Sequence, residues 1–213
     1  MAYNLQDQEQ IDELKAFWNT YGNSLMWLVV IALAAFAGWR AWNWYQDSHA
    51  TDAAAEYAGL VSAAEAHKVD QVRERYQAIQ KSYGSTIYAG MAGLRAADAF
   101  AQGKQADEAI AALQGVMQKS DEPGFRAIAA VRLAGLQLDQ KQYDEALKTL
   151  DVGNTGPVEG ELAGSVADRR ADILMAQGKA AEARTAWDEA LKLLPRQSAL
   201  RPLVQFKREA VAD

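Results

Sequence analysis

The hydrophobic and polar positions divide the chain into two parts. From Ala16 to Trp39 there are 24 consecutive positions without a charged residue. A helix over 18–39 would be roughly 31 Å long at about 1.5 Å per residue, close to the hydrocarbon thickness of a bilayer. Residues 46–213 are instead rich in Ala, Leu, Glu, Gln and Lys and lack sustained alternating β-branched runs. This composition favours helices, so we predict an all-α protein with one long apolar helix at its N-terminal end.

Aromatic residues mark both ends of the apolar stretch. Five of the six tryptophans lie between positions 18 and 44. Amphipathic rings of this kind settle at the headgroup level of a bilayer. We therefore predict a transmembrane anchor over 18–45, preceded by a short acidic tail over 1–17. The predicted aromatic belts are Trp18 and Tyr21 at one edge and Trp39, Trp42, Trp44 and Tyr45 at the other.

Two other interpretations of the apolar stretch are weaker. Ala35-Phe36-Ala37 has the A-x-A form of a signal-peptide cleavage site, but the tail before it carries four acidic residues and one lysine. A secretory signal has a basic segment there. A buried helix of a globular protein rarely stays free of charge for this length. The flanking charges do not settle the orientation, because Lys15 stands on one side and Arg40 on the other.

A repeat with a period of 37 residues runs through the second part. Alanines recur at positions 97, 134 and 171, and again at 109, 146 and 183. Each alanine of the second set is followed four positions later by a large apolar residue, Leu113, Leu150 or Trp187. Small residues where two helices cross, with a bulky residue in the next layer, are typical of stacked helical hairpins.

This pattern resembles the tetratricopeptide repeat, and 175–195 is the best match, with its turn glycine Gly178 and its terminating Pro195. The other two units carry Lys104 and Lys141 where glycine is usual. The predicted organisation of the domain at 46–213 is a degenerate hairpin at 53–83, repeats at about 90–118, 127–152 and 163–194, and a capping segment at 196–213.

Composition excludes several kinds of chemistry. The chain has no cysteine, and its formal net charge of −6 disfavours a general nucleic-acid binder. Neither His49 nor His67 stands in a metal-ligand spacing, and no glycine-rich phosphate loop is present. We therefore expect no catalytic, metal or cofactor site, no small-molecule substrate and no enzyme activity.

Two surfaces are predicted to bind proteins. Small residues on one face of the apolar helix would let another helix approach closely, namely Ala34, Ala37, Gly38 and Ala41. The first helices of stacked repeats line a concave surface, whose projected positions are Met91, Leu94, Asp98, Ile128, Val131, Leu138, Asp168, Asp172 and Met175. An open apolar groove there would mark a binding site. The alternative is internal packing, with the segment around Leu203–Phe206 covering these positions.

The combination of features is similar to one bacterial family. An acidic tail, one membrane helix ending in Gly38-Trp39-Arg40-x-Trp42-Asn43, a Tyr83-Gly84 junction and the ARTAW stretch at 183–187 resemble the YfgM-like ancillary subunits of the SecYEG translocon. The resemblance implies a single-pass inner-membrane protein whose helical domain lies in the periplasm. It further implies association with SecYEG and with a periplasmic chaperone of the PpiD type.

The expected function is a non-catalytic, membrane-tethered adaptor that supports chaperone and client trafficking at the translocon. The sequence leaves two alternatives open. One is a cytoplasm-facing regulatory scaffold for a signalling protein, and the other is an adaptor for cell-envelope or division enzymes. The compartment that holds 46–213 separates the first of these from the translocon hypothesis.

Overall fold

The computed structural model describes the backbone of residues 3–211 and the side chains of residues 15–44 and 48–211. Within this part the chain is helical and contains no β-strand, which confirms the all-α prediction. The helices are α1 (Tyr3–Glu65), α2 (Val69–Ser82), α3 (Ile87–Gln102), α4 (Ala106–Lys119), α5 (Pro123–Asp139), α6 (Tyr143–Thr149), α7 (Val152–Thr155), α8 (Gly160–Ala176), α9 (Ala180–Leu193) and α10 (Arg201–Ala210).

The contacts divide the chain into two units, Met1–His49 and Ala50–Asp213. The first unit consists of the N-terminal part of α1, whose described side chains are exposed apart from that of the half-buried His49 and the position of Gly22. Helix α1 is longer than the predicted anchor, because its backbone is already helical at Tyr3 and continues to Glu65. The second unit contains the end of α1 and the remaining helices.

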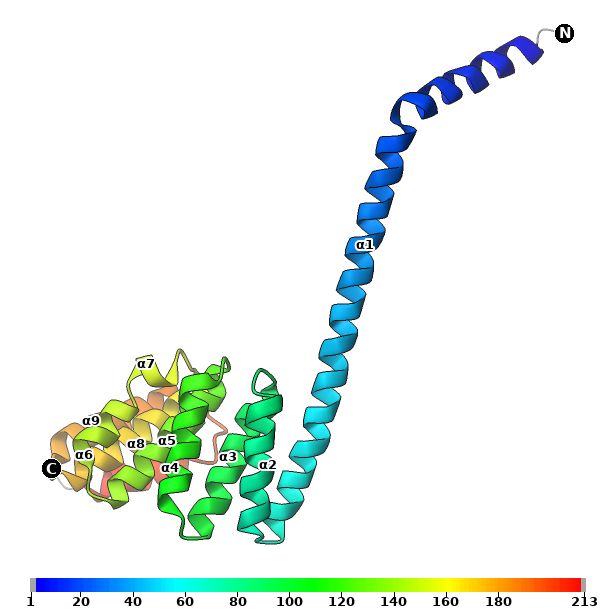
Figure 1. Cartoon of the computed structure of the whole chain (residues 1–213). Helices are drawn as coiled ribbons and strands as arrows, with labels where there is room; N and C mark the ends of the chain where they lie inside the picture. The colour runs from blue at the N-terminus through cyan, green and yellow to red at the C-terminus, as the bar shows by residue number, and fades with distance from the viewer. Residues whose placement is uncertain (1–2, 212–213) are drawn as a thin grey trace. The chain divides into compact units, whose positions relative to one another are not determined.

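The second unit is a stack of helical hairpins. The end of α1 pairs with α2, α3 with α4, α5 with α6, and α8 with α9, while α10 packs on α9 (Figure 1). The four-residue helix α7 occupies the long connection between α6 and α8. Successive hairpins also contact each other, α2 with α3, α4 with α5, and α5 with α8.

The hairpin turns share one backbone geometry. Four residues in the left-handed region stand 37 positions apart, His67 (φ 53°), Lys104 (φ 61°), Lys141 (φ 61°) and Gly178 (φ 80°). After each of them, a backbone N–H donates to the carbonyl five residues earlier, as from Gln105 N to Phe100 O at 2.8 Å. These hydrogen bonds satisfy the orphan carbonyls at the end of each first helix.

The repeated alanines form the helix crossings. Ala97 and Ala109 lie in one buried cluster with Leu113, and the corresponding residues of the next two repeats form two further clusters. The exposed fraction of these six alanines is 2% or less. Their small side chains let the paired helices approach closely, as the sequence pattern requires.

Phe100 is the largest fully buried side chain of the second unit. Its ring lies 6.4 Å from that of Tyr76 in an edge-on arrangement, and the Arg73 guanidinium lies 5.9 Å from its centroid. We predict that F100A lowers the free energy of unfolding by about 3–5 kcal/mol, because it removes buried area and leaves a cavity. Urea unfolding of the full chain in detergent, followed by circular dichroism, measures this.

The matched control is F206A, because Phe206 is 70% exposed. It should change the free energy of unfolding by no more than about 0.5 kcal/mol. Equal losses in the two variants would contradict the assignment of Phe100 to the core.

Candidate protein-binding surfaces

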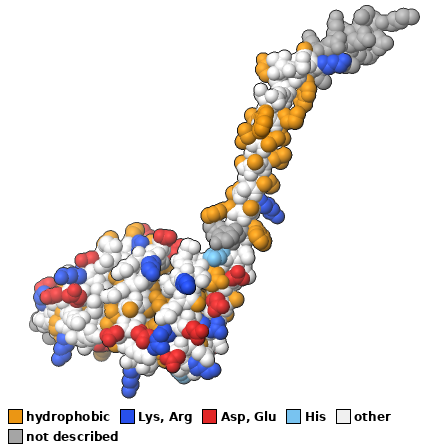
Figure 2. Space-filling view, viewed as in Figure 1, with side chains coloured by type: hydrophobic (Ala, Val, Ile, Leu, Met, Phe, Trp, Pro, Cys, Tyr) orange, Lys and Arg blue, Asp and Glu red, His pale blue; other side chains and the backbone are white. Residues whose placement is uncertain are grey.

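The apolar part of α1 is exposed along its length. One helix of the described chain is long and apolar enough to cross a membrane, and none of its most apolar window is buried. Figure 2 shows hydrophobic side chains following this helix. The predicted belt residues Trp18, Tyr21, Trp39, Trp42 and Trp44 are each more than half exposed, whereas Tyr45 lies outside the described side chains. Such a surface is costly in water and is suited to lipid.

The predicted small-residue face of this helix is open. Ala34, Ala37, Gly38 and Ala41 are all exposed. A Cβ added at Gly38 would meet no atom within 4 Å. Their spacing places them on one side of the helix, where the backbone is accessible to a second helix.

The predicted concave positions fall into two groups, the apolar residues and the acidic residues, and the apolar residues are taken first. Leu94 is 8% exposed and belongs to the core cluster around Phe100. Ile128 packs against the same cluster, while Val131 and Leu138 pack against the cluster of the next repeat. Met91 is half-buried and Met175 is 42% exposed. The aliphatic side chains of the middle repeat therefore serve largely as packing between first helices.

The acidic positions of the third repeat lie under the C-terminal helix. Lys207 Nζ of α10 donates to both carboxylate oxygens of Asp168 at 3.0 Å and to Asp172 at 2.9 Å. The indole N–H of Trp187 also donates to Asp168 at 3.0 Å. Val204, one turn before Lys207, is fully buried in the same cluster as Ala171. Helix α10 thus caps the α8–α9 hairpin.

The outer side of α10 is different from its inner side. Leu203 and Phe206, which the sequence analysis named as covering residues, are 49% and 70% exposed. On the inner side of α10, Lys207 binds Asp168 of α8 and the side chain of Val204 is fully buried.

Burial perturbs one of these carboxyls. The pKa of Asp172 is raised above its ordinary value, chiefly because burial penalises the charged form and secondarily by the neighbouring Asp168. The hydrogen bond from Lys207 and the charge of Arg169 oppose this shift only in part. The site therefore holds two carboxylates that compete for one ammonium group.

The sequence analysis missed the basic residues of this surface. Arg95, Arg132 and Arg169 recur at the 37-residue period on α3, α5 and α8. Arg132 Nη1 donates to Asp98 at 2.8 Å and to the carbonyl of Leu94 at 3.1 Å, joining two first helices. The period itself is the signal that would have found these residues, because each first helix presents the same positions to its neighbour in the stack.

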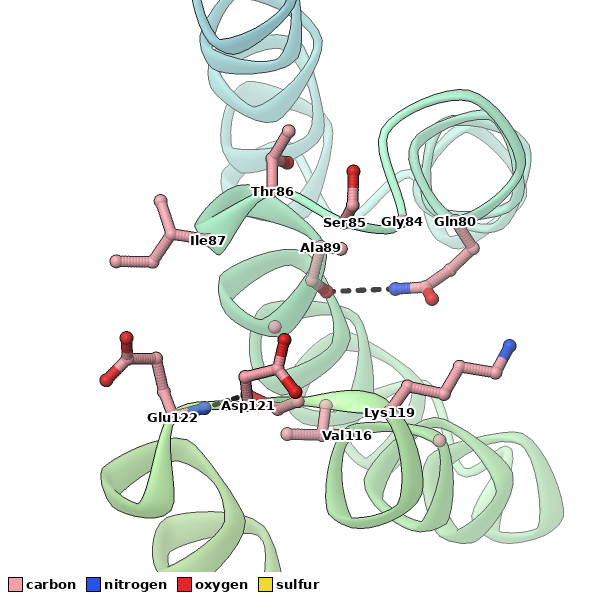
Figure 3. A pocket seen from close by; sticks show the side chains of 13 residues that line it. Gln80, Gly84, Ser85, Thr86, Ile87, Ala89, Val116, Lys119, Asp121 and Glu122 are labelled. Atoms are coloured by element: carbon pink, nitrogen blue, oxygen red, sulfur yellow. Dashed lines mark hydrogen bonds between the residues drawn. The ribbon is translucent and has the colours of Figure 1, made fainter. Parts of the chain in front are cut away.

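A separate pocket of about 180 Å³ lies between the ends of α2 and α4 and the start of α3. Figure 3 shows Gln80 pointing to Ala89, whose carbonyl accepts a hydrogen bond from Gln80 Nε2 at 2.9 Å. Lys119 and Glu122 lie at opposite sides of the pocket. The lining offers hydroxyl, amide, ammonium and carboxylate groups. Among the described residues no group of three His, Asp or Glu could hold a metal ion.

Comparison with known proteins agrees with the helical repeats. Residues 15–213 match the family described as tetratricopeptide repeat-like domain. The chain is 32% identical to the ancillary SecYEG translocon subunit of Neisseria gonorrhoeae, over 99% of this chain and all of the relative. It is 32% identical to the protein of the same description in Escherichia coli over 87% of each chain. The corresponding protein of Haemophilus influenzae is 27% identical over 89% of this chain and 91% of the relative.

The raised pKa of Asp172 predicts a pH-dependent effect of D172N. Since the folded state binds this proton more tightly than the unfolded state, the stability contributed by protonation is present at low pH. It is lost as the pH rises from about 4 through the raised pKa. The isosteric D172N removes this loss, so its stability relative to the wild type should increase across that interval.

Urea unfolding of both proteins at a series of pH values checks the direction. The control is D188N, because Asp188 on α9 also accepts a hydrogen bond from a basic residue of α10, Arg208, at 3.0 Å. A relative stability of D172N that falls with rising pH would contradict the assignment.

Proposed function

The chain belongs to the family of ancillary SecYEG translocon subunits, and we propose that it is a non-catalytic, membrane-tethered adaptor that binds SecYEG and helps clients and chaperones meet at the channel. The single observation that carries this proposal is the joining of an exposed, membrane-length apolar helix to a tetratricopeptide repeat-like domain in one chain. Family resemblance adds a periplasmic chaperone of the PpiD type as a second partner.

The two parts have complementary roles in this proposal. The apolar helix spans the inner membrane once and presents the Ala34, Ala37, Gly38 and Ala41 face to a helix of the translocon. The repeat domain lies in the periplasm, as the resemblance implies, and binds polypeptides through its first helices. Tethering raises the concentration of the domain near the channel, so each contact can be weak.

The location of the C-terminus tests the orientation. A reporter that is active only in the periplasm, fused after Asp213, should be active, because the proposed topology places residues 46–213 there. A second fusion with a reporter that is active only in the cytoplasm should be inactive. The full-length fusion should remain in the membrane fraction, since an anchor is not cleaved.

The reverse pattern of activities would refute the periplasmic adaptor and favour the cytoplasm-facing regulatory scaffold. A shortened, soluble product that begins just after the Ala35-Phe36-Ala37 motif would instead indicate a cleaved signal.

Association with the translocon tests the small-residue face. We predict that A37L lowers the amount of SecYEG that co-purifies with the chain in mild detergent by about tenfold, because a larger side chain prevents close helix approach. The matched control is A32L, which makes the same change on the opposite side of the helix.

Co-purification that is unchanged in A37L, or equally reduced in A32L, would rule out this face as the contact. Both variants must reach the membrane in wild-type amounts for the comparison to count.

A further inference from the structure

The first helices of the repeats carry a ladder of ion pairs with one carboxylate missing. Asp98 on α3 pairs with Arg132 on α5 at 2.8 Å, and Asp172 on α8 pairs with Lys207 on α10 at 2.9 Å. The position between them, one period after Asp98 and one before Asp172, is Gly135 on α5. Arg169 on α8 is the basic residue one period after Arg132, so it faces a position without a side chain.

The Arg169 side chain makes an ion pair with Asp172 but no side-chain hydrogen bond within the described part of the chain. Its Nε is buried and unpartnered. Its closest carboxylate oxygen belongs to Asp172, at 3.7 Å from Nη1, which is beyond hydrogen-bond length, and Asp172 is already bound to Lys207. The buried Nε–H is one of the five N–H donors of the guanidinium, and leaving a buried donor unsatisfied is unfavourable.

Space for a carboxylate adjoins this guanidinium. A Cβ built on Gly135 would lie 3.6 Å from Arg169 Cζ and 3.7 and 3.8 Å from its terminal nitrogens, in ordinary contact. A cavity of about 270 Å³ borders Arg169, Gly135 and Arg132, and its wall also includes the apolar residues Ala101, Leu113 and Leu136. The wall also contains two acids, Asp98, which pairs with Arg132, and Asp139, which is exposed.

We propose that this cavity binds the side-chain carboxylate of an Asp or Glu in a partner polypeptide, which completes the missing rung by pairing with Arg169. Arg169 is the specificity-determining residue, and the apolar wall receives the aliphatic side chains beside the acid. The Arg169 guanidinium and the register of the ladder select an acidic side chain, because both filled rungs use aspartates. The partner class rests on the proposed function, in which the repeats bind polypeptides.

Nuclear magnetic resonance on the purified full-length chain in detergent tests this directly. The protein is labelled with ¹⁵N-arginine, and the Nε–Hε resonance of Arg169 is assigned from its absence in R169Q. The probes are the blocked peptide acetyl-Leu-Ala-Glu-Ala-Leu-amide and its Gln counterpart at millimolar concentration. We expect a saturable shift of the Arg169 resonance with the Glu peptide and at least about tenfold weaker binding of the Gln peptide.

Two variants of Gly135 give the matched comparison. G135D supplies the missing carboxylate from within the chain, so it should shift the Arg169 resonance without peptide and abolish the response to the Glu peptide. G135A adds only a Cβ in ordinary contact and should keep that response. Circular dichroism checks that both variants are folded.

The alternative outcomes are distinct. No saturable shift with the Glu peptide, equal binding of the Glu and Gln peptides, or a Glu response that survives in G135D would each overturn the proposal. A third probe is the Gln peptide with a free C-terminus. If the Arg169 resonance shifts with this peptide alone, the site binds a terminal carboxylate, and the side-chain assignment is overturned. The measurement needs no translocon, so its failure is separate from failure of the topology and co-purification experiments.

Discussion

The close approach of paired helices at buried alanines is the constraint on which the repeat domain depends. At Ala97 and Ala109, and at the equivalent pairs one and two periods later, no larger side chain fits without separating the helices. Because each crossing recurs after 37 residues, successive hairpins enter the stack in the same register. Each first helix therefore presents the same positions to its neighbour, and this register aligns Asp98 with Arg132, 34 residues later, across two repeats.

The hairpin turns keep one geometry although only one of them has glycine at the left-handed position. His67, Lys104 and Lys141 hold a left-handed conformation that glycine adopts at lower cost. Each turn is closed by backbone hydrogen bonds, as between Lys68 N and Ala63 O at 2.9 Å, which depend on no side chain. Packing of the alanine crossings and these hydrogen bonds together offset the unfavourable dihedral angle. The repeats that lack the usual glycine consequently keep the same geometry as the one that contains Gly178.

The sequence predicted those features that depend on one helix or on one hairpin. The 24-residue uncharged stretch predicted one long apolar helix, and the spacing of the alanines predicted stacked hairpins. Both the helical class and the repeat-like domain are confirmed. The environment of the concave positions depends on which neighbour covers them. Leu94 faces the core and Asp168 is bound by Lys207, 39 residues away, and neither relation is visible in a local pattern. That the Nε of Arg169 lacks a partner could be predicted only by comparing Gly135 with the acids one period before and after it.

A single carboxylate pair on a partly exposed groove is a weak contact, because water competes for both charges and salt screens them. Such a contact would be insufficient for a freely diffusing protein that binds polypeptides of varied sequence. A domain tethered to the same membrane as its partner meets that partner at a high effective concentration, and a weak site is then adequate and releases quickly. In the proposed function the exposed apolar helix and the incomplete ion-pair ladder would act together, because tethering makes a site of low affinity sufficient.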